Sequence, residues 1–536
     1  MDRGASNTLR TIASAPVLLV ITLLASAVPI LSVAYPPVLD YPNHLARIWL
    51  LSGKVDEAPL SSMYAANWSQ ASTNIAVDFI ASSAARIVPI GLVNTLLLLA
   101  MFLGPPIGAI LLNRAIGRAW HGWRIAALFL AWSTTAIAGF LNFQIGLAAA
   151  LACAALFARR NAMSGWPGFG TCLASAVLLL LIHPFALFFY AALGSGLILG
   201  DRPALPRSVR DIALHARALT PLALACLLPL LGLFLFAPTP PGVHANGATS
   251  ILWSPLAKMI DPFRLAKVIA SPVLTYDARM DLLILLPFAI AIGWAALSGR
   301  IRFHTGLLIA AVTLTFLACL APEEIGDASW IQRRLPPMAA LTLVAAILPA
   351  RRERDRMDQV LIAVIATTLL LRIGGIEKVW LARQPDFAGL GDALGSVPRG
   401  AALLVSRQDW TDAARFPVGR LMAGNPGLPV ETGRHLVAPF AVRGGFFIPT
   451  LFTVPGQQPL SVMPAWRSRS VYISSIPFVS RLGTDDPKDP YVRNWARDFD
   501  YLLVLNADMG ALPAYVSRDV TLVSDRGFAR LYRIRK

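Results

Sequence analysis

The sequence is poor in charged residues and in cysteine. Only 14% of its 536 residues are Asp, Glu, Lys or Arg, whereas about a quarter is usual in soluble proteins, and 56% of the residues are apolar. The four cysteines all fall in apolar stretches and none follows residue 376, which excludes a disulfide framework and a cysteine-based metal site. Internal repeats and low-complexity tracts are absent too. This composition is typical of a polytopic membrane protein.

Eleven apolar stretches are separated by polar or Pro/Gly-rich breaks, as expected for membrane spans of about 20 residues. The stretches on either side of Asn142 and of His183 are short, and each pair could form one kinked element. The predicted spans are 16–34, 89–112, 124–140, 142–158, 170–183, 185–199, 218–237, 281–298, 305–321, 335–349 and 359–376.

Acidic residues are missing from the middle of every predicted span. Transporters coupled to protons or ions usually carry ionisable residues inside their spans, so this absence argues against that class. Arg372, near the outer end of the last span, is expected to snorkel to the membrane interface.

Arginine-rich loops give the expected orientation, because short cytoplasmic loops carry an excess of Lys and Arg. Threading the spans alternately places most loop arginines on the side of the N-terminus, including the "RRERDR" run at 351. The N-terminus is therefore expected in the cytoplasm, with the first span an uncleaved anchor, and everything after residue 376 outside. This topology explains most of the net charge of +17. No nucleic-acid recognition module is visible, so no nucleic-acid partner is expected.

After residue 376 the pattern of short apolar runs between polar and turn residues becomes typical of a soluble domain. The short apolar runs "AALLVS" at 401 and "YLLVLNA" at 501 are predicted strands, "TLVSDRGFARLYRI" is a predicted closing hairpin around Asp525 to Gly527, and "FAGLGDALGSV" is a predicted helix. The segment "GGFFIPTLFTVPGQQPL" is too broken by Pro and Gly for a span and is expected to lie against the membrane part. We predict a mainly α fold: a transmembrane domain over residues 1–376 and a small periplasmic α/β domain over residues 377–536.

The first outer loop begins "VAYPPVLDYPNHLARIWLL", residues 33–51. Pro36 and Pro37 are expected to end the first span, and "YPNHLARIWLL" to start a surface helix. Asp40 precedes that helix, whose positive end favours an ionised carboxylate. A carboxylate at this place can take the proton of an attacking hydroxyl, or it can simply cap the helix.

This arrangement resembles the GT-C superfamily of membrane glycosyltransferases, in which an acid at the end of the first span precedes a surface helix, many spans and an exported C-terminal domain. The stretches "PPVLDYPNHLAR", "GFLNFQIGLA", "LIHPFAL" and "FIPTLFTVPGQQPL" look like bacterial relatives of the protein mannosyltransferase and aminoarabinose transferase group. The resemblance implies a polyprenyl-phosphate or polyprenyl-diphosphate sugar donor at the outer face, inversion of the anomeric centre, and Asp40 as the base. Many members have two near-adjacent acids in this loop, whereas Tyr41 follows Asp40 here. A lone carboxylate is a poor divalent-metal site, so we expect metal-independent chemistry and no cofactor besides the donor.

Further polar residues on the outer side are candidates for substrate contact. Arg333 and Arg334 stand where a span re-enters the membrane from outside, against the usual charge bias, and a lipid phosphate is a reasonable counter-ion; the alternative is an ion pair with Glu323, Glu324 or Asp327. The remaining candidates are Asn43, His44, Lys54, Asn142 and His183, of which the last two could instead satisfy broken backbone.

Taken with the topology, the resemblance implies an inverting glycosyltransferase of the bacterial inner membrane. Its expected partners are a polyprenyl-phosphate sugar donor, a glycan, lipid or protein acceptor, and the membrane lipids. A transporter or flippase of lipid-linked saccharides would share the spans and the basic rims, but would explain neither Asp40 nor the exported domain. A non-catalytic membrane scaffold is the third hypothesis.

Overall fold

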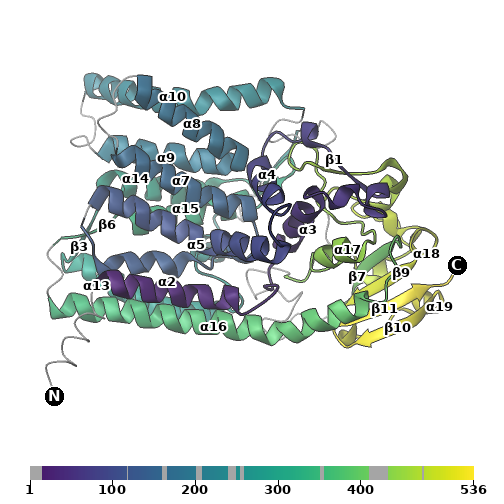
Figure 1. Cartoon of the computed structure of the whole chain (residues 1–536). Helices are drawn as coiled ribbons and strands as arrows, with labels where there is room; N and C mark the ends of the chain where they lie inside the picture. The colour runs from purple at the N-terminus through teal and green to yellow at the C-terminus, as the bar shows by residue number, and fades with distance from the viewer. Residues whose placement is uncertain are drawn as a thin grey trace, which may run out of the picture. The chain divides into compact units, whose positions relative to one another are not determined.

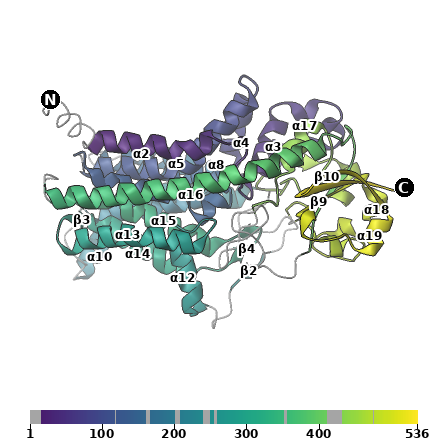
Figure 2. The same cartoon turned by 90° about the horizontal axis from the view of Figure 1, so that it is seen from below.

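The computed structural model describes residues 15–117, 119–159, 166–200, 208–238, 249–253, 259–350, 355–409, 432–473 and 476–536. The chain is mostly helical and forms two compact units (Figures 1 and 2). The helical unit comprises the described parts of Met1–Ser32, Leu98–Ala136 and Asn142–Glu377, and the mixed unit comprises Val33–Leu97, Ile137–Leu141 and Lys378–Lys536. The mixed unit therefore includes the first outer loop as well as the C-terminal region that the sequence predicted as a separate domain.

Long apolar helices make up the helical unit. Within it α14 packs against α9 and α15, while α8 packs against α9 and α10 (Figure 1). Among the described residues five helices are long and apolar enough to cross a membrane: α5, α7, α10, α13 and α16. The bounds are α2 (Ala15–Leu31), α5 (Ile90–Gly117), α7 (Leu141–Arg159), α8 (Trp166–Ile182), α9 (Pro184–Gly200), α10 (Val209–Phe236), α12 (Pro262–Ala270), α13 (Ala278–Leu297), α14 (Thr305–Leu320), α15 (Ile331–Ala345) and α16 (Arg356–Leu394).

Two of these helices expose apolar side chains over most of their length. Only 22% of the apolar window of α10 and 17% of that of α13 is buried. In water such a surface would drive association, whereas lipid tails solvate it as well as a protein interior does. Leucines exposed along α10 and α13 therefore indicate lipid-facing helices, as expected for a membrane protein. They include Leu224, Leu227, Leu231, Leu235, Leu282, Leu283 and Leu286.

The predicted span 124–140 is not a regular helix. Residues Gly122–Leu130 form the 3-10 helix η4, and Thr134–Ile137 form the short helix α6. Nearly every residue here is buried, among them Trp123, Trp132 and Phe140. Irregular backbone is tolerated at membrane depth when protein surrounds it. Hydropathy detects burial but does not distinguish lipid from protein as the surroundings, and for this reason it gave no sign that the helix here is irregular.

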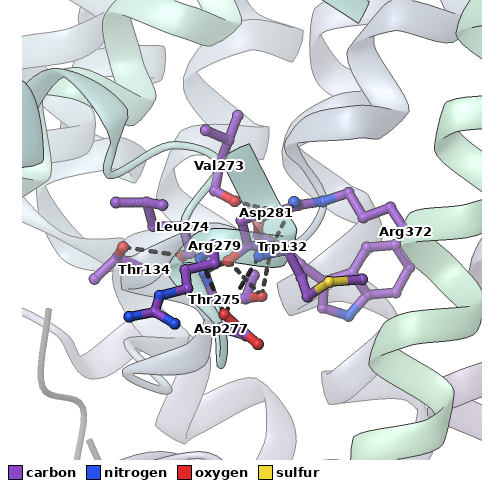
Figure 3. Close-up of polar contacts among 10 residues, drawn as sticks. Trp132, Thr134, Val273, Leu274, Thr275, Asp277, Arg279, Asp281 and Arg372 are labelled. Atoms are coloured by element: carbon purple, nitrogen blue, oxygen red, sulfur yellow. Dashed lines mark hydrogen bonds and ion pairs between the residues drawn. The ribbon is translucent and has the colours of Figure 1, made fainter. Parts of the chain in front are cut away.

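Arg372 does not snorkel as predicted: it is only 2% exposed and lies in a buried network (Figure 3). Its Nη1 donates to Asp281 Oδ1 at 3.0 Å, and its Nη2 donates to the carbonyls of Trp132 and Val273 at 2.6 and 2.7 Å. Thr275 Oγ1 donates to the same carboxylate oxygen at 2.9 Å. One arginine on α16 thus satisfies carbonyls of two non-helical segments, a need that arises wherever a buried chain leaves helical geometry.

Two small sheets join loops of the helical unit. Strand β3 (Ile301–Phe303) pairs antiparallel with β6 (Ile347–Pro349), so the predicted span 335–349 ends as a strand. Strand β4 (Glu324–Ile325) lies between β2 (Ile251–Leu252) and β5 (Ala328–Ser329) in an antiparallel sheet. The hairpin β4–β5 leads directly into α15 and so fixes where Arg333 and Arg334 enter that helix.

A four-stranded sheet forms the core of the mixed unit, in the order β10-β11-β9-β7. Strands β7 (Leu403–Arg407) and β9 (Tyr501–Leu505) are parallel, and β11 (Ala529–Ile534) pairs antiparallel with β9 and with β10 (Val520–Arg526). All of β7 is buried, which explains its unbroken apolar run. Both strands and the closing hairpin predicted from the sequence are confirmed, and so is the helix at "FAGLGDALGSV", most of which forms the end of α16.

The first outer loop folds onto this C-terminal region within the mixed unit. Helix α3 (Tyr41–Leu51) packs against α4 (Ile75–Ala84) and α17 (Ala438–Gly444), and β1 (Tyr64–Ala66) pairs antiparallel with β8 (Leu460–Val462). The Pro/Gly-broken segment around residues 444–460 contacts this loop: Tyr64 Oη donates to the carbonyl of Ile448 at 3.2 Å. Shorter helices complete the unit: η1 (Lys54–Asp56), η2 (Leu60–Ser62), η3 (Trp68–Gln70), η6 (Pro464–Arg469), η7 (Val479–Arg481), η8 (Pro490–Val492), α18 (Trp495–Asp498), η9 (Ala507–Met509) and α19 (Ala514–Arg518).

Candidate functional site

Asp40 lies immediately before α3, in a turn whose backbone is held by the segment 137–141. The N–H groups of Leu39 and Asp40 donate to the carbonyls of Ile137 and Ala138 at 3.1 and 3.0 Å. Gly139 allows this close approach: it has φ +71°, and a Cβ there would lie 2.5 Å from the Tyr41 nitrogen. Gly139 is the first residue of the "GFLNFQ" stretch singled out in the sequence, but its importance for Asp40 emerges only in the fold.

The carboxylate of Asp40 does not cap α3. Its backbone is already helical, with φ −86° and ψ −24°, and its side chain makes no capping hydrogen bond. The N–H of His44 instead donates to the Asp40 carbonyl at 3.2 Å, so Asp40 and His44 share one helix face. The capping explanation for Asp40 is therefore wrong, and its side chain, 19% exposed, is oriented by other contacts.

Asn43 is completely buried, and its amide forms three bonds inside the mixed unit. Its Oδ1 accepts from the N–H of Phe452 at 2.9 Å, which fixes which end of the amide is nitrogen. Its Nδ2 then donates to the Thr450 carbonyl at 2.8 Å and lies 3.3 Å from His435 Nδ1. Asn43 thus holds the segment 450–452 and one histidine against α3.

His435 is the residue next to Asp40 that sequence reasoning missed. Its Nε2 lies 3.7 Å from Asp40 Oδ1. Burial and the neighbouring Arg434 lower the pKa of His435 to about 3, so the ring is neutral at ordinary pH. Since Nδ1 accepts from Asn43, the proton of the neutral ring is on Nε2, facing the carboxylate. Asn43 and His435 are 392 residues apart in sequence, and a lone histidine in "GRHLV" gives no local signal of this contact.

A buried ion pair fixes the second histidine of the cluster. Arg47 Nε and Nη2 donate to the two carboxylate oxygens of Asp78, both at 3.0 Å. Arg47 Nη2 also lies 2.8 Å from His44 Nδ1, which must therefore accept. The ring of Phe452 packs edge-on against His44 and His435, with centroids 5.7 and 4.9 Å away. With Nδ1 accepting from Arg47, the Nε2 side of the His44 ring is the side that can carry a proton.

Lys54 lies at the surface of the same unit. It begins η1 and pairs with Glu57 at 2.6 Å, with side chains 40% and 55% exposed. An exposed pair of this kind contributes little to stability. None of the contacts described above for Asp40, His44 and His435 involves Lys54.

The helical unit brings Arg334 and His183 together. Arg334 Nη1 lies 3.3 Å from His183 Nε2, and Arg334 Nε donates to the Ser329 carbonyl at 3.2 Å. The guanidinium also stacks over the rings of Phe143 and Phe185, 5.4 and 5.6 Å from their centroids. The His183 ring lies between two N–H donors, with the Phe185 N–H 3.1 Å from Nδ1 and Arg334 Nη1 3.3 Å from Nε2, and a neutral ring can accept from one of them at a time. The Arg334 N–H is directed at the His183 ring, so the guanidinium is held between this ring and the Ser329 carbonyl.

Arg333 and Asn142 occupy different surroundings. The guanidinium of Arg333 lies 4.4 Å from the ring centroid of Trp330, which has a positive φ of 61° at the start of α15. Asn142 is buried in the first turn of α7, directly before Phe143 under Arg334. The candidates thus fall into two groups: Asp40, Asn43 and His44 in the mixed unit, and Asn142, His183, Arg333 and Arg334 in the helical unit.

Within the described ranges, no group of three or more His, Cys, Asp or Glu side chains is arranged to hold a metal ion. No protein-family model and no curated protein sequence matches the chain. The functional argument therefore rests on the geometry of the two residue groups.

Proposed function

We propose that the chain is an inverting glycosyltransferase of the GT-C type, which transfers a sugar from a polyprenyl-phosphate donor to an acceptor outside the cytoplasm of a bacterial inner membrane. The proposal rests on the surroundings of the Asp40 carboxylate. Its carboxylate is partly exposed, is not used to cap a helix, and is approached by the neutral N–H of His435. A carboxylate held in this way can orient a hydroxyl and take its proton.

In the proposed reaction the acceptor hydroxyl attacks the anomeric carbon of the donor sugar while Asp40 takes the hydroxyl proton. A new C–O bond forms on the opposite face from the leaving group, and the bond between the anomeric carbon and the phosphate oxygen breaks. The electron pair leaves with the polyprenyl phosphate. No metal or cofactor takes part, and the developing charge on the phosphate needs N–H donors.

Arg334 beside His183 is the better candidate for that phosphate contact, because the Ser329 carbonyl and the His183 ring hold its guanidinium in a fixed position. Stacking on Phe143 and Phe185 holds the guanidinium plane. Arg333 and Asn142 are secondary candidates. We assign Asn43 and His44 to acceptor or donor contact only through the face that α3 shares with Asp40, and Lys54 only through its place in the first outer loop.

The proposal keeps an odd number of crossings, with the N-terminus in the cytoplasm and the mixed unit in the periplasm. The chain enters the helical unit at Leu98 and leaves it after Ala136. We propose that α5 makes the passage in one direction and that the irregular segment η4–α6 makes the return. Reporter fusions after residues 350 and 376 should indicate cytoplasm and periplasm respectively; a cytoplasmic signal from the second would overturn this topology.

The decisive experiment compares Asp40→Asn with Asp40→Ala in the purified full chain, supplied with polyprenyl-phosphate sugars and candidate acceptors. Loss of a positioned base should lower transfer by about 10²- to 10⁴-fold in both variants, with the melting temperature of Asp40→Asn unchanged. Asp56→Asn is the matched control, since Asp56 is an exposed acid of the same loop. Near-normal turnover of Asp40→Asn would remove Asp40 from the chemistry, and loss in the Asp56 variant alone would move the base there.

A flippase of lipid-linked saccharides is the second candidate, favoured by the buried Arg372–Asp281 pair, since ionisable groups inside transporters are often functional. The bonds of Arg372 to two backbone carbonyls argue for a structural role instead. A flippase would move labelled polyprenyl-phosphate sugar across liposomes equally well with Asp40→Asn, and would release no transferred sugar.

A further inference from the structure

We propose that His435 is a positioning residue for Asp40: as a neutral imidazole whose tautomer Asn43 fixes, it donates its Nε2–H to the carboxylate and holds it ready to accept a proton. This inference rests on the proposed function for its consequence in catalysis. The contact itself does not depend on which reaction Asp40 serves.

The tautomer follows from the bonds of Asn43. The Phe452 N–H occupies the amide oxygen at 2.9 Å, so the group facing His435 Nδ1 at 3.3 Å is an N–H donor. Nδ1 therefore accepts, and the single proton of the neutral ring is on Nε2, the atom nearest Asp40. Asn43 cannot turn its amide around without breaking its bonds to both Phe452 and Thr450.

The ring is also held in place. His435 is 5% exposed and packs edge-on against Phe452, and the adjacent Arg434 and burial keep it uncharged. Among the residues that the structure describes, the titratable and charged groups around the two residues include His44 and Arg47 on α3, Asp78 on α4, and Arg434. Arg47 is committed to Asp78 and His44.

The distance of 3.7 Å from Nε2 to Oδ1 exceeds that of a formed hydrogen bond. Catalytic hydrogen bonds are commonly long in the absence of substrate and shorten in the reactive complex. The Asp40 backbone is fixed by Ala138 and the ring by Asn43, so the inferred bond requires only that the Asp40 side chain turn toward the ring. In that bond the N–H donates to Oδ1, and the ionised carboxylate keeps its capacity to take a hydroxyl proton.

The test measures the pKa of Asp40 without requiring activity. Carbodiimide modifies protonated carboxyl groups, so the pH midpoint of Asp40 modification in the full chain, followed by peptide mass spectrometry, gives that pKa. An N–H donor favours the ionised carboxylate, so His435→Phe should move the midpoint upward by about 1 to 2 pH units. His435→Gln, whose amide nitrogen reaches the Nε2 position, should restore it. His121→Phe is the control, because His121 is equally buried but belongs to the helical unit.

Equal midpoints in wild type and His435→Phe would overturn the inference. If the Phe variant does not fold, His435→Asn replaces it: its amide reaches only the Nδ1 position, so its midpoint should lie above that of His435→Gln, and equal midpoints again overturn the inference. Where transfer is measurable, His435→Phe should lower kcat more than it changes KM and move the acidic limb of the pH profile by the same interval. If the midpoint shifts but wild type transfers no sugar, the His435–Asp40 contact is supported and the proposed glycosyltransferase function is refuted. If wild type transfers sugar but the midpoint does not shift, the function is supported and the contact is refuted.

Discussion

The buried pair of Arg47 and Asp78 gives the most quantitative prediction about the mixed unit. Their side chains are 1% and 0% exposed, and two bonds of 3.0 Å join α3 to α4. We consider three variants: Arg47→Met, which keeps the length of the side chain, Asp78→Leu, and the double variant, which replaces the ion pair with two apolar side chains.

The expected magnitude follows from the burial of both charges. At 3.0 Å and an effective dielectric constant of 20 the attraction is about 5 kcal/mol, and the cost of taking both ions out of water offsets much of it. Removing one partner leaves the other charge buried without compensation, so each single variant should lose about 3 to 5 kcal/mol of unfolding free energy. The double variant should lie within about 2 kcal/mol of wild type, because no unpaired charge remains.

The assay is denaturant unfolding of the detergent-solubilised full chain, followed by tryptophan fluorescence. The reasoning would be refuted if each single variant lost less than about 1 kcal/mol of unfolding free energy and the two losses added up in the double variant. The pair would then contribute no more than an exposed ion pair does. Arg47→Met should also free His44 Nδ1 and so lower transfer, whereas a stability effect alone would leave the turnover of the folded fraction unchanged.

Three further predictions concern the surroundings of the two residue groups. Gly139→Ala should cost about 1 to 3 kcal/mol of stability and lower transfer, since the backbone of residue 139 is left-handed and a Cβ there would meet the Asp40 turn. Gly170→Ala is the control, because the space around Gly170 is open. A loss of similar size in the control would contradict the argument. Because the pKa of His435 is about 3 in the folded chain and ordinarily 6.5, the unfolded chain binds more protons between these values. Stability should therefore fall on acidification through that window by about 1.4 kcal/mol per pH unit, and His435→Phe should flatten the dependence measured by unfolding at pH 7 and pH 5. Arg334→Ala should raise the KM for the donor by about 10- to 100-fold, because one charge-assisted contact is lost. Arg333→Ala should change this KM little. Equal effects of the two variants would contradict the assignment of the phosphate contact to Arg334 beside His183.

Local pattern was sufficient for the helices of the helical unit and the strands of the mixed unit. Runs of apolar residues long enough to span lipid predicted α5, α7, α10, α13 and α16, since a helix satisfies its own backbone wherever it lies. Short apolar runs bounded by turn residues predicted β7 and β9, and the turn at Asp525 to Gly527 predicted the β10–β11 hairpin, because these signals extend over a few neighbouring residues. The sequence also singled out Asp40, because its place after an apolar run and before a helix start is a local feature.

The tertiary structure alone decided what these elements meet. It made residues 122–140 an irregular buried segment instead of a regular helix, since hydropathy is the same for a residue facing lipid and one facing protein. It buried Arg372 against Asp281, because the partner is supplied by another helix and no spacing encodes it. It also brought His435 to Asp40 and fixed the ring proton through Asn43. Side-chain contacts between segments hundreds of residues apart depend on how whole elements pack, and packing is a property of the folded chain that no stretch of sequence carries by itself.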